Sequence, residues 1–195
     1  MTTTRVVIAI TGASGAIYGV RALQLLRTVP DVETHLVVTT AGRATLAAET
    51  PHTLPEVRAL ADVVHGDHQL SAPIASGSYR VDGMLVAPCS IKTLSGIATS
   101  YDDTLVVRAA DVVLKERRTL VLLVRETPLH AGHLRLMSQV TDNGAIVFPP
   151  VPAFYAKPET VDDMVDHTVG RALDLFGIDV GAVRRWQGMG RCHDT

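Results

Sequence analysis

A short loop rich in glycine and hydroxyl residues follows the first apolar run of the chain. Residues 11–19 read TGASGAIYG and lead from an expected buried strand directly into an expected helix. Glycines let the backbone approach a ligand closely, and a helix N-terminus offers N–H groups and a positive dipole to a phosphate. Ser14 adds a hydroxyl donor. The loop is therefore a candidate phosphate site, and a tight turn without a ligand is the alternative.

The features that this loop lacks narrow the kind of nucleotide. The dinucleotide fingerprint G-x-G-x-x-G needs a glycine where Ser14 stands. The second apolar run ends in Thr39 and Thr40, without the carboxylate that holds a ribose diol. The loop also lacks the P-loop pattern G-x-x-x-x-G-K-[ST]. These differences favour FMN, with its single phosphate and its ribityl chain, over NAD and ATP.

A second polar loop follows the third apolar run and reads PCSIKTLS over residues 88–95. Ser90 and Thr93 stand where a helix would begin, so capping of that helix is their simpler role and ligand binding is the functional one. Cys89 is a candidate nucleophile, but the sequence nominates no partner histidine and nothing that would lower the thiol pKa. We therefore do not expect a catalytic thiolate.

Two charged residues, Arg125 and Glu126, interrupt the apolar pattern directly after residues 120–124. An arginine fork matches a phosphate in a bidentate manner. A glutamate beside it can transfer a proton if its pKa suits the reaction. The alternative is an ion pair at the end of a strand, which contributes little to stability.

Other polar residues have a simple structural role beside a functional one. The spacing of Arg108, Asp111 and Lys115 favours an exposed ion ladder on one helix face. The segment 149–155 contains three prolines and two aromatic residues, and suits either a rigid pocket wall or ordinary loop packing. Arg171 lies on a helix whose other face is apolar, so exposure to solvent is its simpler role.

The elements that position these residues alternate along the chain. Apolar runs without polar alternation indicate strands buried on both faces, and apolar residues at three- and four-residue spacing indicate helices. This alternation predicts one α/β domain with a doubly wound parallel sheet. We place the domain at residues 1–178 and a C-terminal arm or tail at 179–195. The expected strands are 6–10, 35–38, 83–87, 120–124 and 145–148, and the expected helices are 17–28, 42–49, 93–99, 104–117, 129–141 and 161–176.

The charge and hydropathy of the chain exclude several classes of protein. The 195 residues include 18 basic and 20 acidic side chains without a long basic stretch, so we expect no nucleic-acid partner. No apolar run approaches the roughly 18 residues that span a bilayer, and the first run is too short for the core of a signal peptide. Only 19% of residues are charged and the mean hydropathy is +0.22. This excess of apolar residues predicts a homo-oligomer.

The cysteines and histidines give no sign of a disulfide framework or a metal centre. Cys89 and Cys192 are far apart and form no C-x-x-C pair, which favours a reduced, cytoplasmic protein. His130 and His133 lie three residues apart but lack a third ligand, so we expect no metal.

Seven segments, taken in order, resemble the UbiX/Pad-type flavin prenyltransferase family, whose members were long described as aromatic acid decarboxylase subunits. The resemblance covers nearly the whole chain. The segments are 11–16 (TGASGA), 75–78 (ASGS), 88–94 (PCSIKTL), 108–118 (RAADVVLKERR), 125–128 (RETP), 149–155 (PPVPAFY) and 185–186 (RW).

The resemblance implies a flavodoxin-like or Rossmann-like three-layer subunit in a dodecamer, with active sites where subunits meet. It also implies a metal-independent prenyl transfer from dimethylallyl monophosphate to reduced FMN. In this reaction flavin N5 displaces the phosphate and flavin C6 closes a fourth ring. The product, prenylated FMN, would serve a UbiD-type decarboxylase as its cofactor.

The resemblance further implies a role for each residue at a matching position. FMN would be held by Gly12, Ala13, Ser14, Thr39, Ser90, Ile91, Lys92, Thr93 and Arg125. The prenyl phosphate would be held by Tyr155, Arg171, Lys115 and Arg125, with Arg108 and Trp186. Catalysis would involve Glu126, Ser14, Glu49 and Lys115. For Lys115 and Arg171 the resemblance therefore reverses the simpler structural interpretation.

Two departures and two alternative functions accompany this resemblance. Thr39 stands where many relatives have serine, and it keeps the hydroxyl. Leu70 lies near the position of a tryptophan that some relatives use to stabilise an allylic cation, a role that Trp186 could fill in part.

The alternatives are an FMN-binding, non-catalytic subunit of an aromatic acid decarboxylase and an FMN-dependent oxidoreductase like the cysteine decarboxylases. The predicted phosphate-binding residues argue against the second alternative.

Overall fold

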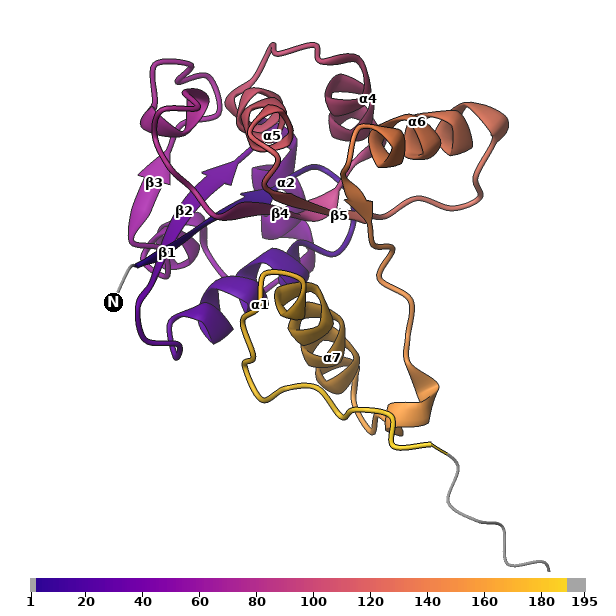
Figure 1. The fold of residues 1–195 in the computed structure, drawn as a ribbon. Helices are drawn as coiled ribbons and strands as arrows, with labels where there is room; N and C mark the ends of the chain where they lie inside the picture. Colours follow the sequence, from indigo (N-terminus) through magenta and orange to yellow (C-terminus); the bar gives the residue numbers. More distant parts are fainter. Residues whose placement is uncertain (1–2, 189–195) are drawn as a thin grey trace, which may run out of the picture.

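Six parallel strands form one sheet in the computed structural model, which describes residues 3–188 (Figure 1). Their order across the sheet is β3-β2-β1-β4-β5-β6. This is the order of a Rossmann sheet, and without the short edge strand β3 it becomes the flavodoxin order. The predicted doubly wound α/β fold is therefore confirmed. The strands are β1 (Thr4–Ile10), β2 (Val32–Val38), β3 (Val63–His65), β4 (Gly83–Cys89), β5 (Thr119–Val124) and β6 (Ile146–Val147).

Helices cover both faces of the sheet and create two apolar cores (Figure 1). Successive residues of a strand point to opposite faces, so that Val7 packs into one core and Ile8 into the other. One face carries α4 (Ile91–Thr99), α5 (Leu105–Lys115) and α6 (Ala131–Asp142). The other face carries α1 (Ala16–Leu26), α2 (Thr40–Glu49), α3 (Leu54–Arg58) and α7 (Val161–Asp174).

Side-chain caps explain where several of the helices begin. Ser90 accepts a hydrogen bond from the amide of Thr93 at the start of α4, which confirms its predicted capping role. Thr104 caps α5 in the same way. At the start of α7, Thr160 and Asp163 form a capping box. Hydroxyl residues at the strand–helix junctions therefore have a structural role, whatever ligand they also hold.

Three expectations about the elements were wrong. Neither α3 nor β3 was expected, because these elements have only five and three residues and show too little periodicity. The last strand was expected to be buried over residues 145–148, but β6 has two residues and both are only half-buried. It lies at the edge of the sheet and pairs with β5 alone. Several helices also begin or end one or two residues away from their expected bounds.

The chain after α7 folds back over the 153–156 segment. Arg184 Nη1 donates a 2.8 Å hydrogen bond to the carbonyl of Ala156, and the Trp186 ring lies edge to face with Tyr155, with 5.6 Å between the ring centroids. Residues 189–195 of the expected tail, including Cys192, lie outside the described residues, and the boundary at residue 178 stays a prediction. No helix between residues 3 and 188 is long and apolar enough to cross a membrane.

Candidate active site

The carboxyl ends of β1, β2, β4 and β5 bring four of the predicted loops to one edge of the sheet. The buried Thr11 hydroxyl donates to the carbonyl of Pro88 at 2.7 Å and accepts from the amide of Ser90 at 2.8 Å. The amide of Thr39 donates to the last carbonyl of β1, and the amide of Arg125 to the last carbonyl of β4. Backbone and side-chain hydrogen bonds therefore fix the four loops relative to one another.

A cavity of about 240 Å³ opens between these loops. The Thr39 hydroxyl accepts a 2.9 Å hydrogen bond from the amide of Gly42, which leaves its proton available to a ligand. Lys92 supplies a cation beside the Ser90 cap of α4. Hydroxyls and one cation suit a ribityl chain and a single phosphate. The lining residues are Gly12, Thr39, Thr40, Ala41, Asp67, His68, Ser90, Lys92, Thr93, Asp103, Thr104 and Val107.

Gly12 and Gly15 of the first loop have structural reasons of their own. A Cβ atom on Gly12 would clash with the Cβ of Ala41, so the glycine lets this loop pack closely against α2. Gly15 has a φ of 101°, in the left-handed region that side chains disfavour. Close packing and backbone conformation therefore require both glycines, whether or not the loop contacts a ligand.

The N-terminus of α1, expected to bind a phosphate, is occupied by a carboxylate of the chain. Glu49 Oε2 accepts hydrogen bonds from the amides of Gly15 at 2.7 Å and Ala16 at 3.4 Å. Burial opposes ionisation of Glu49, but hydrogen bonds from Ser14 and these amides, together with the charge of Arg125, outweigh it and lower the pKa. A phosphate at this loop must therefore be held by residues 12–14, and the expectation of open amides at the helix start was wrong.

A second, wider cavity of about 540 Å³ borders the other side of the first loop. It brings Ser14, Glu49 and Arg125 together, as the predicted site requires. Tyr18 also lines it, and burial raises the pKa of this phenol although Arg125 opposes the shift. Sequence reasoning missed Tyr18, although its position one helical turn after Ser14 could have indicated it.

Glu126 and Cys89 lie beside this region in very different environments. The exposed Glu126 carboxylate accepts a 2.9 Å hydrogen bond from the amide of Thr127. Within the described chain it forms no ion pair with Arg125, so the strand-end ion pair is not observed. Cys89 is fully buried, and burial raises the pKa of its thiol to about 12. Cys89 therefore remains a thiol at neutral pH, as expected.

Three predicted phosphate-site residues lie near one another around α7. The Tyr155 hydroxyl lies 3.3 Å from Nε2 of His167, a residue that the sequence did not indicate. Arg171 pairs with Asp174 at 2.6 Å. Hydrogen bonds from Arg185 and Arg171, and their charges, lower the pKa of Asp174 although burial opposes this. Trp186 completes the group by its contact with Tyr155.

Arg108 lies near the start of α5, beside the first cavity, whereas Lys115 lies at the far end of this helix, away from that edge of the sheet. Arg108 pairs with Asp111 at 3.2 Å, as the ion ladder predicts. Lys115 does not continue this ladder to Asp111 but pairs with Glu116 at 2.6 Å, so that part of the expectation was wrong. Lys115 lies where β5 begins and Arg125 where β5 ends. Six strand residues span about 20 Å, so one subunit cannot bring both cations to one phosphate.

The histidine pair of α6 is packed and does not bridge a metal site. His130 and His133 have ring centroids 3.7 Å apart, and His130 Nδ1 accepts a 3.0 Å hydrogen bond from the amide of Gly132. Between residues 3 and 188, no three His, Cys, Asp or Glu side chains group closely enough to hold a metal ion.

Comparison with known proteins agrees with the geometry. The Flavoprotein family profile matches residues 1–173. The flavin prenyltransferase UbiX of Escherichia coli K12 is 59% identical over 186 residues, which cover 94% of this chain and 98% of the relative. The UbiX relative of Thauera aromatica is 52% identical and covers 94% of each chain.

A solved structure with the same fold contains two ligands. AnUbiX in complex with FMN and dimethylallyl pyrophosphate superposes with a TM-score of 0.93 at 52% identity, covering 96% of this chain and 99% of that one. The profile, the curated relatives and the solved structure agree over nearly the whole length. This chain therefore belongs to the flavoprotein family and, within it, to the UbiX flavin prenyltransferases.

Proposed function

We propose that this protein joins reduced FMN and dimethylallyl monophosphate to form prenylated FMN, the cofactor of a UbiD-type decarboxylase. The observation that carries the proposal is the meeting of Ser14, Glu49 and Arg125 in one cavity, next to a cavity lined with hydroxyl groups. The curated relatives named as flavin prenyltransferases support it, as does the relative solved with FMN and dimethylallyl pyrophosphate.

FMN would bind across the two cavities at the carboxyl edge of the sheet. Lys92 would neutralise its phosphate, with hydroxyl groups from Ser90 and Thr93 beside it, and the available proton of Thr39 would reach the ribityl chain. Gly12, Ala13 and Ile91 would contribute backbone contacts. Arg125, which lines the second cavity, would contact the flavin there. Reduced FMN supplies the N5 and C6 nucleophiles of the reaction.

The prenyl phosphate needs cations and hydrogen-bond donors aimed at the charge that develops as it leaves. Tyr155, Arg171 and Arg125 would supply donors, and Lys115 would supply a second cation. Lys115 lies before the first residue of β5 and Arg125 after its last residue, at opposite ends of this strand. The Lys115 ammonium at the site would therefore come from another subunit. The protein would therefore act as a homo-oligomer, and we propose a dodecamer.

A solved relative supports this assembly. It is described as a dodecameric FMN-dependent UbiX-like decarboxylase from Escherichia coli O157:H7, with a TM-score of 0.93, 52% identity and coverage of 95% of this chain and 100% of that one. The exposed Phe154, Tyr155 and Trp186 side chains provide apolar and aromatic surface that contact between subunits would cover. We propose that the enzyme works in the cytoplasm, as the cysteine content suggests.

Proton transfer during ring closure would depend on carboxylates near the flavin. Glu49 has a lowered pKa and therefore carries charge at neutral pH, which makes it a proton acceptor. Ser14, which donates a hydrogen bond to it, would connect it to the ligand. Glu126 would serve a second proton position next to Arg125.

An anaerobic incubation with reduced FMN and dimethylallyl monophosphate tests the proposal, with mass spectrometry of the extracted flavin. We expect a flavin heavier by one five-carbon prenyl unit, absent without the protein. Unmodified FMN that remains bound to a folded oligomer would instead support the non-catalytic subunit. Oxidation of a peptidyl cysteine without prenyl transfer would support the oxidoreductase.

A further inference from the structure

Two aromatic side chains hold Tyr155 from different directions. His167 Nε2 lies 3.3 Å from the Tyr155 hydroxyl oxygen, and the two rings meet edge to face with centroids 5.6 Å apart. The Trp186 ring makes a second edge-to-face contact, also at 5.6 Å. Contacts of this kind limit rotation of the phenol ring. The direction of the Tyr155 hydroxyl is therefore fixed in the subunit before any ligand binds.

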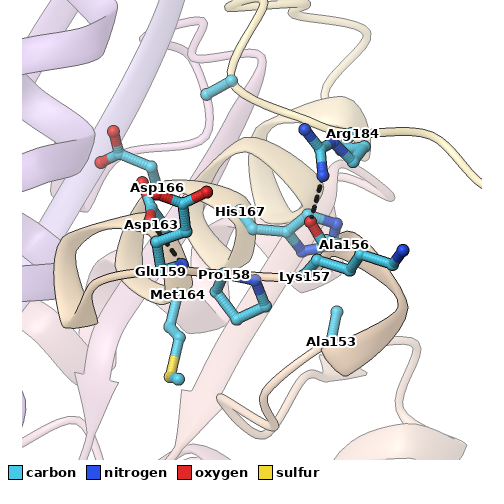
Figure 2. A pocket seen from close by; sticks show the side chains of 11 residues that line it. Ala153, Ala156, Lys157, Pro158, Glu159, Asp163, Met164, Asp166, His167 and Arg184 are labelled. Atoms are coloured by element: carbon cyan, nitrogen blue, oxygen red, sulfur yellow. Dashed lines mark hydrogen bonds between the residues drawn. The ribbon is translucent and has the colours of Figure 1, made fainter.

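The His167 imidazole contacts the Tyr155 phenol from the protein interior, on the side away from solvent. His167 is 9% exposed and Tyr155 is 45% exposed, so a ligand can reach the tyrosine while the histidine remains covered. His167 and Arg171 are four residues apart on α7, which places both on one helix face. Figure 2 shows the His167 side chain projecting from the helix toward the segment around Ala156.

The donors and acceptors of the Tyr155 phenol and the His167 imidazole link this arrangement to phosphate binding. A phenol hydroxyl has one proton to donate, whereas a fully ionised phosphate oxygen only accepts. If His167 accepts the phenol proton, Tyr155 cannot give that proton to a phosphate. If His167 carries its proton on Nε2, it donates to the phenol oxygen and directs the Tyr155 proton outward.

We propose that His167 is a positioning residue for prenyl-phosphate binding, acting through the hydroxyl of Tyr155. The inference rests on the proposed function, because that function places the prenyl phosphate at Tyr155. A leucine would fill the same buried space without a polar group, so the imidazole is not explained by packing alone.

A cavity of about 310 Å³ borders the imidazole and lets water exchange its ring protons. Figure 2 shows Arg184 on its wall, with the dashed hydrogen bond to Ala156. The charged groups that line it are Lys157, Arg184, Glu159, Asp163 and Asp166. His167 can therefore adopt the Nε2–H form when a phosphate binds to the phenol.

The chain contains a single tryptophan, and its contact with Tyr155 makes it a reporter of this site. The FMN-loaded protein with oxidised flavin is titrated with dimethylallyl monophosphate while Trp186 fluorescence is followed. We expect His167→Leu to raise the Kd for the prenyl phosphate about three- to tenfold, as for loss of one hydrogen bond. His167→Gln, whose amide can reach the phenol, should restore binding. His167→Asn is too short and should not.

A double-mutant cycle tests whether His167 acts through the hydroxyl. In a Tyr155→Phe background, His167→Leu should add no further loss, and in all variants the Kd for FMN should be unchanged. Unchanged prenyl-phosphate binding in His167→Leu would overturn the proposal. So would an equal loss in both backgrounds, or an equal weakening of FMN. If His167→Leu does not fold, the Kd values of the Gln and Asn variants for the prenyl phosphate test the proposal, and equal Kd values for these two variants would overturn it.

The proposed function and this inference can fail separately. If the wild-type protein binds dimethylallyl monophosphate in the predicted way but yields no heavier flavin, the proposed function is wrong and the role of His167 stands. If transfer occurs but the cycle shows no coupling, the inference about His167 is wrong. No binding and no transfer would overturn both.

Discussion

The Glu49 carboxylate accepts a 2.7 Å hydrogen bond from the amide of Gly15, a residue 34 positions earlier in the chain. This contact places a negative charge at the N-terminus of α1, where the helix dipole favours it. The pKa of Glu49 is lowered because the hydrogen bonds from Ser14 and the loop amides and the charge of Arg125 outweigh burial. The chain therefore holds an ionised carboxylate in the cavity that contains Ser14 and Arg125.

Glu49→Gln should slow formation of prenylated FMN at least about tenfold and leave the Kd for FMN within about twofold. The amide oxygen of glutamine can still accept from Gly15, so the variant removes the charge and keeps the shape. The measurement is single-turnover product formation beside an FMN titration, with Glu159→Gln as an exposed control. Because the pKa lies below 4.5, protonation of Glu49 should not limit the wild-type rate at neutral pH. An unchanged rate in the Gln variant would exclude Glu49 as the base.

Glu126→Gln should also slow product formation and leave FMN affinity intact. Its carboxylate already accepts from the amide of Thr127, and the glutamine oxygen can replace that contact. Intermediate accumulation, followed by mass spectrometry of quenched reactions, distinguishes this step from the one assigned to Glu49. Equal rates for wild type and variant would rule out a proton-transfer role for Glu126.

Lys115→Ala should weaken binding of the prenyl phosphate more than binding of FMN. Because Lys115 and Arg125 lie at opposite ends of β5, the two side chains at one site would come from different subunits. An inactive Lys115→Ala protein co-assembled with an inactive Arg125→Ala protein should therefore recover activity in about a quarter of its sites. Arg80→Ala, 81% exposed at the same edge as Lys115, is the matched control. Hybrids without activity would contradict a site shared between subunits.

The sequence predicted the sheet and its edge well because buried parallel strands carry continuous apolar runs. Thr39, Ser90 and Arg125 each follow such a run, so their convergence follows from parallel topology alone. The hydrogen bond from Gly15 to Glu49 and the contact of Tyr155 with His167 could not be predicted, because helix packing creates them. Periodicity also could not indicate β3, which has three residues.

The first loop and the loop after β4 should lose their alignment when the Thr11 hydroxyl is removed. Thr11→Val leaves the Ser90 amide without its partner, which costs about 1–3 kcal/mol, and removes one of the two donors to the Pro88 carbonyl, which keeps the backbone amide of residue 11 at 3.3 Å. We expect a lower melting temperature and weaker FMN binding, although Thr11 is fully buried and cannot touch the ligand. Thr11→Ser keeps the hydroxyl and should behave like wild type. Normal FMN affinity in Thr11→Val would show that this bond does not align the site.

A buried histidine pair should make stability depend on pH. His65 Nε2 lies 3.0 Å from His35 Nδ1, and His35 Nε2 lies 2.8 Å from a Glu33 carboxylate oxygen. Burial, with a further contribution from His35, lowers the pKa of His65 below 6.5. Above this value both the folded and the unfolded chain carry a neutral His65. As the pH falls below it, the unfolded chain binds the proton first, so folding loses stability.

The melting temperature of the wild-type protein should therefore fall between about pH 7.5 and pH 5.5 at constant protein concentration. His65→Gln can still donate to His35 Nδ1 but cannot bind that proton, so its melting temperature should fall less steeply. His68→Gln, an exposed histidine three residues later, should keep the wild-type slope. If the slopes for wild type and His65→Gln are the same, the acid sensitivity arises elsewhere and His65 does not couple protonation to folding.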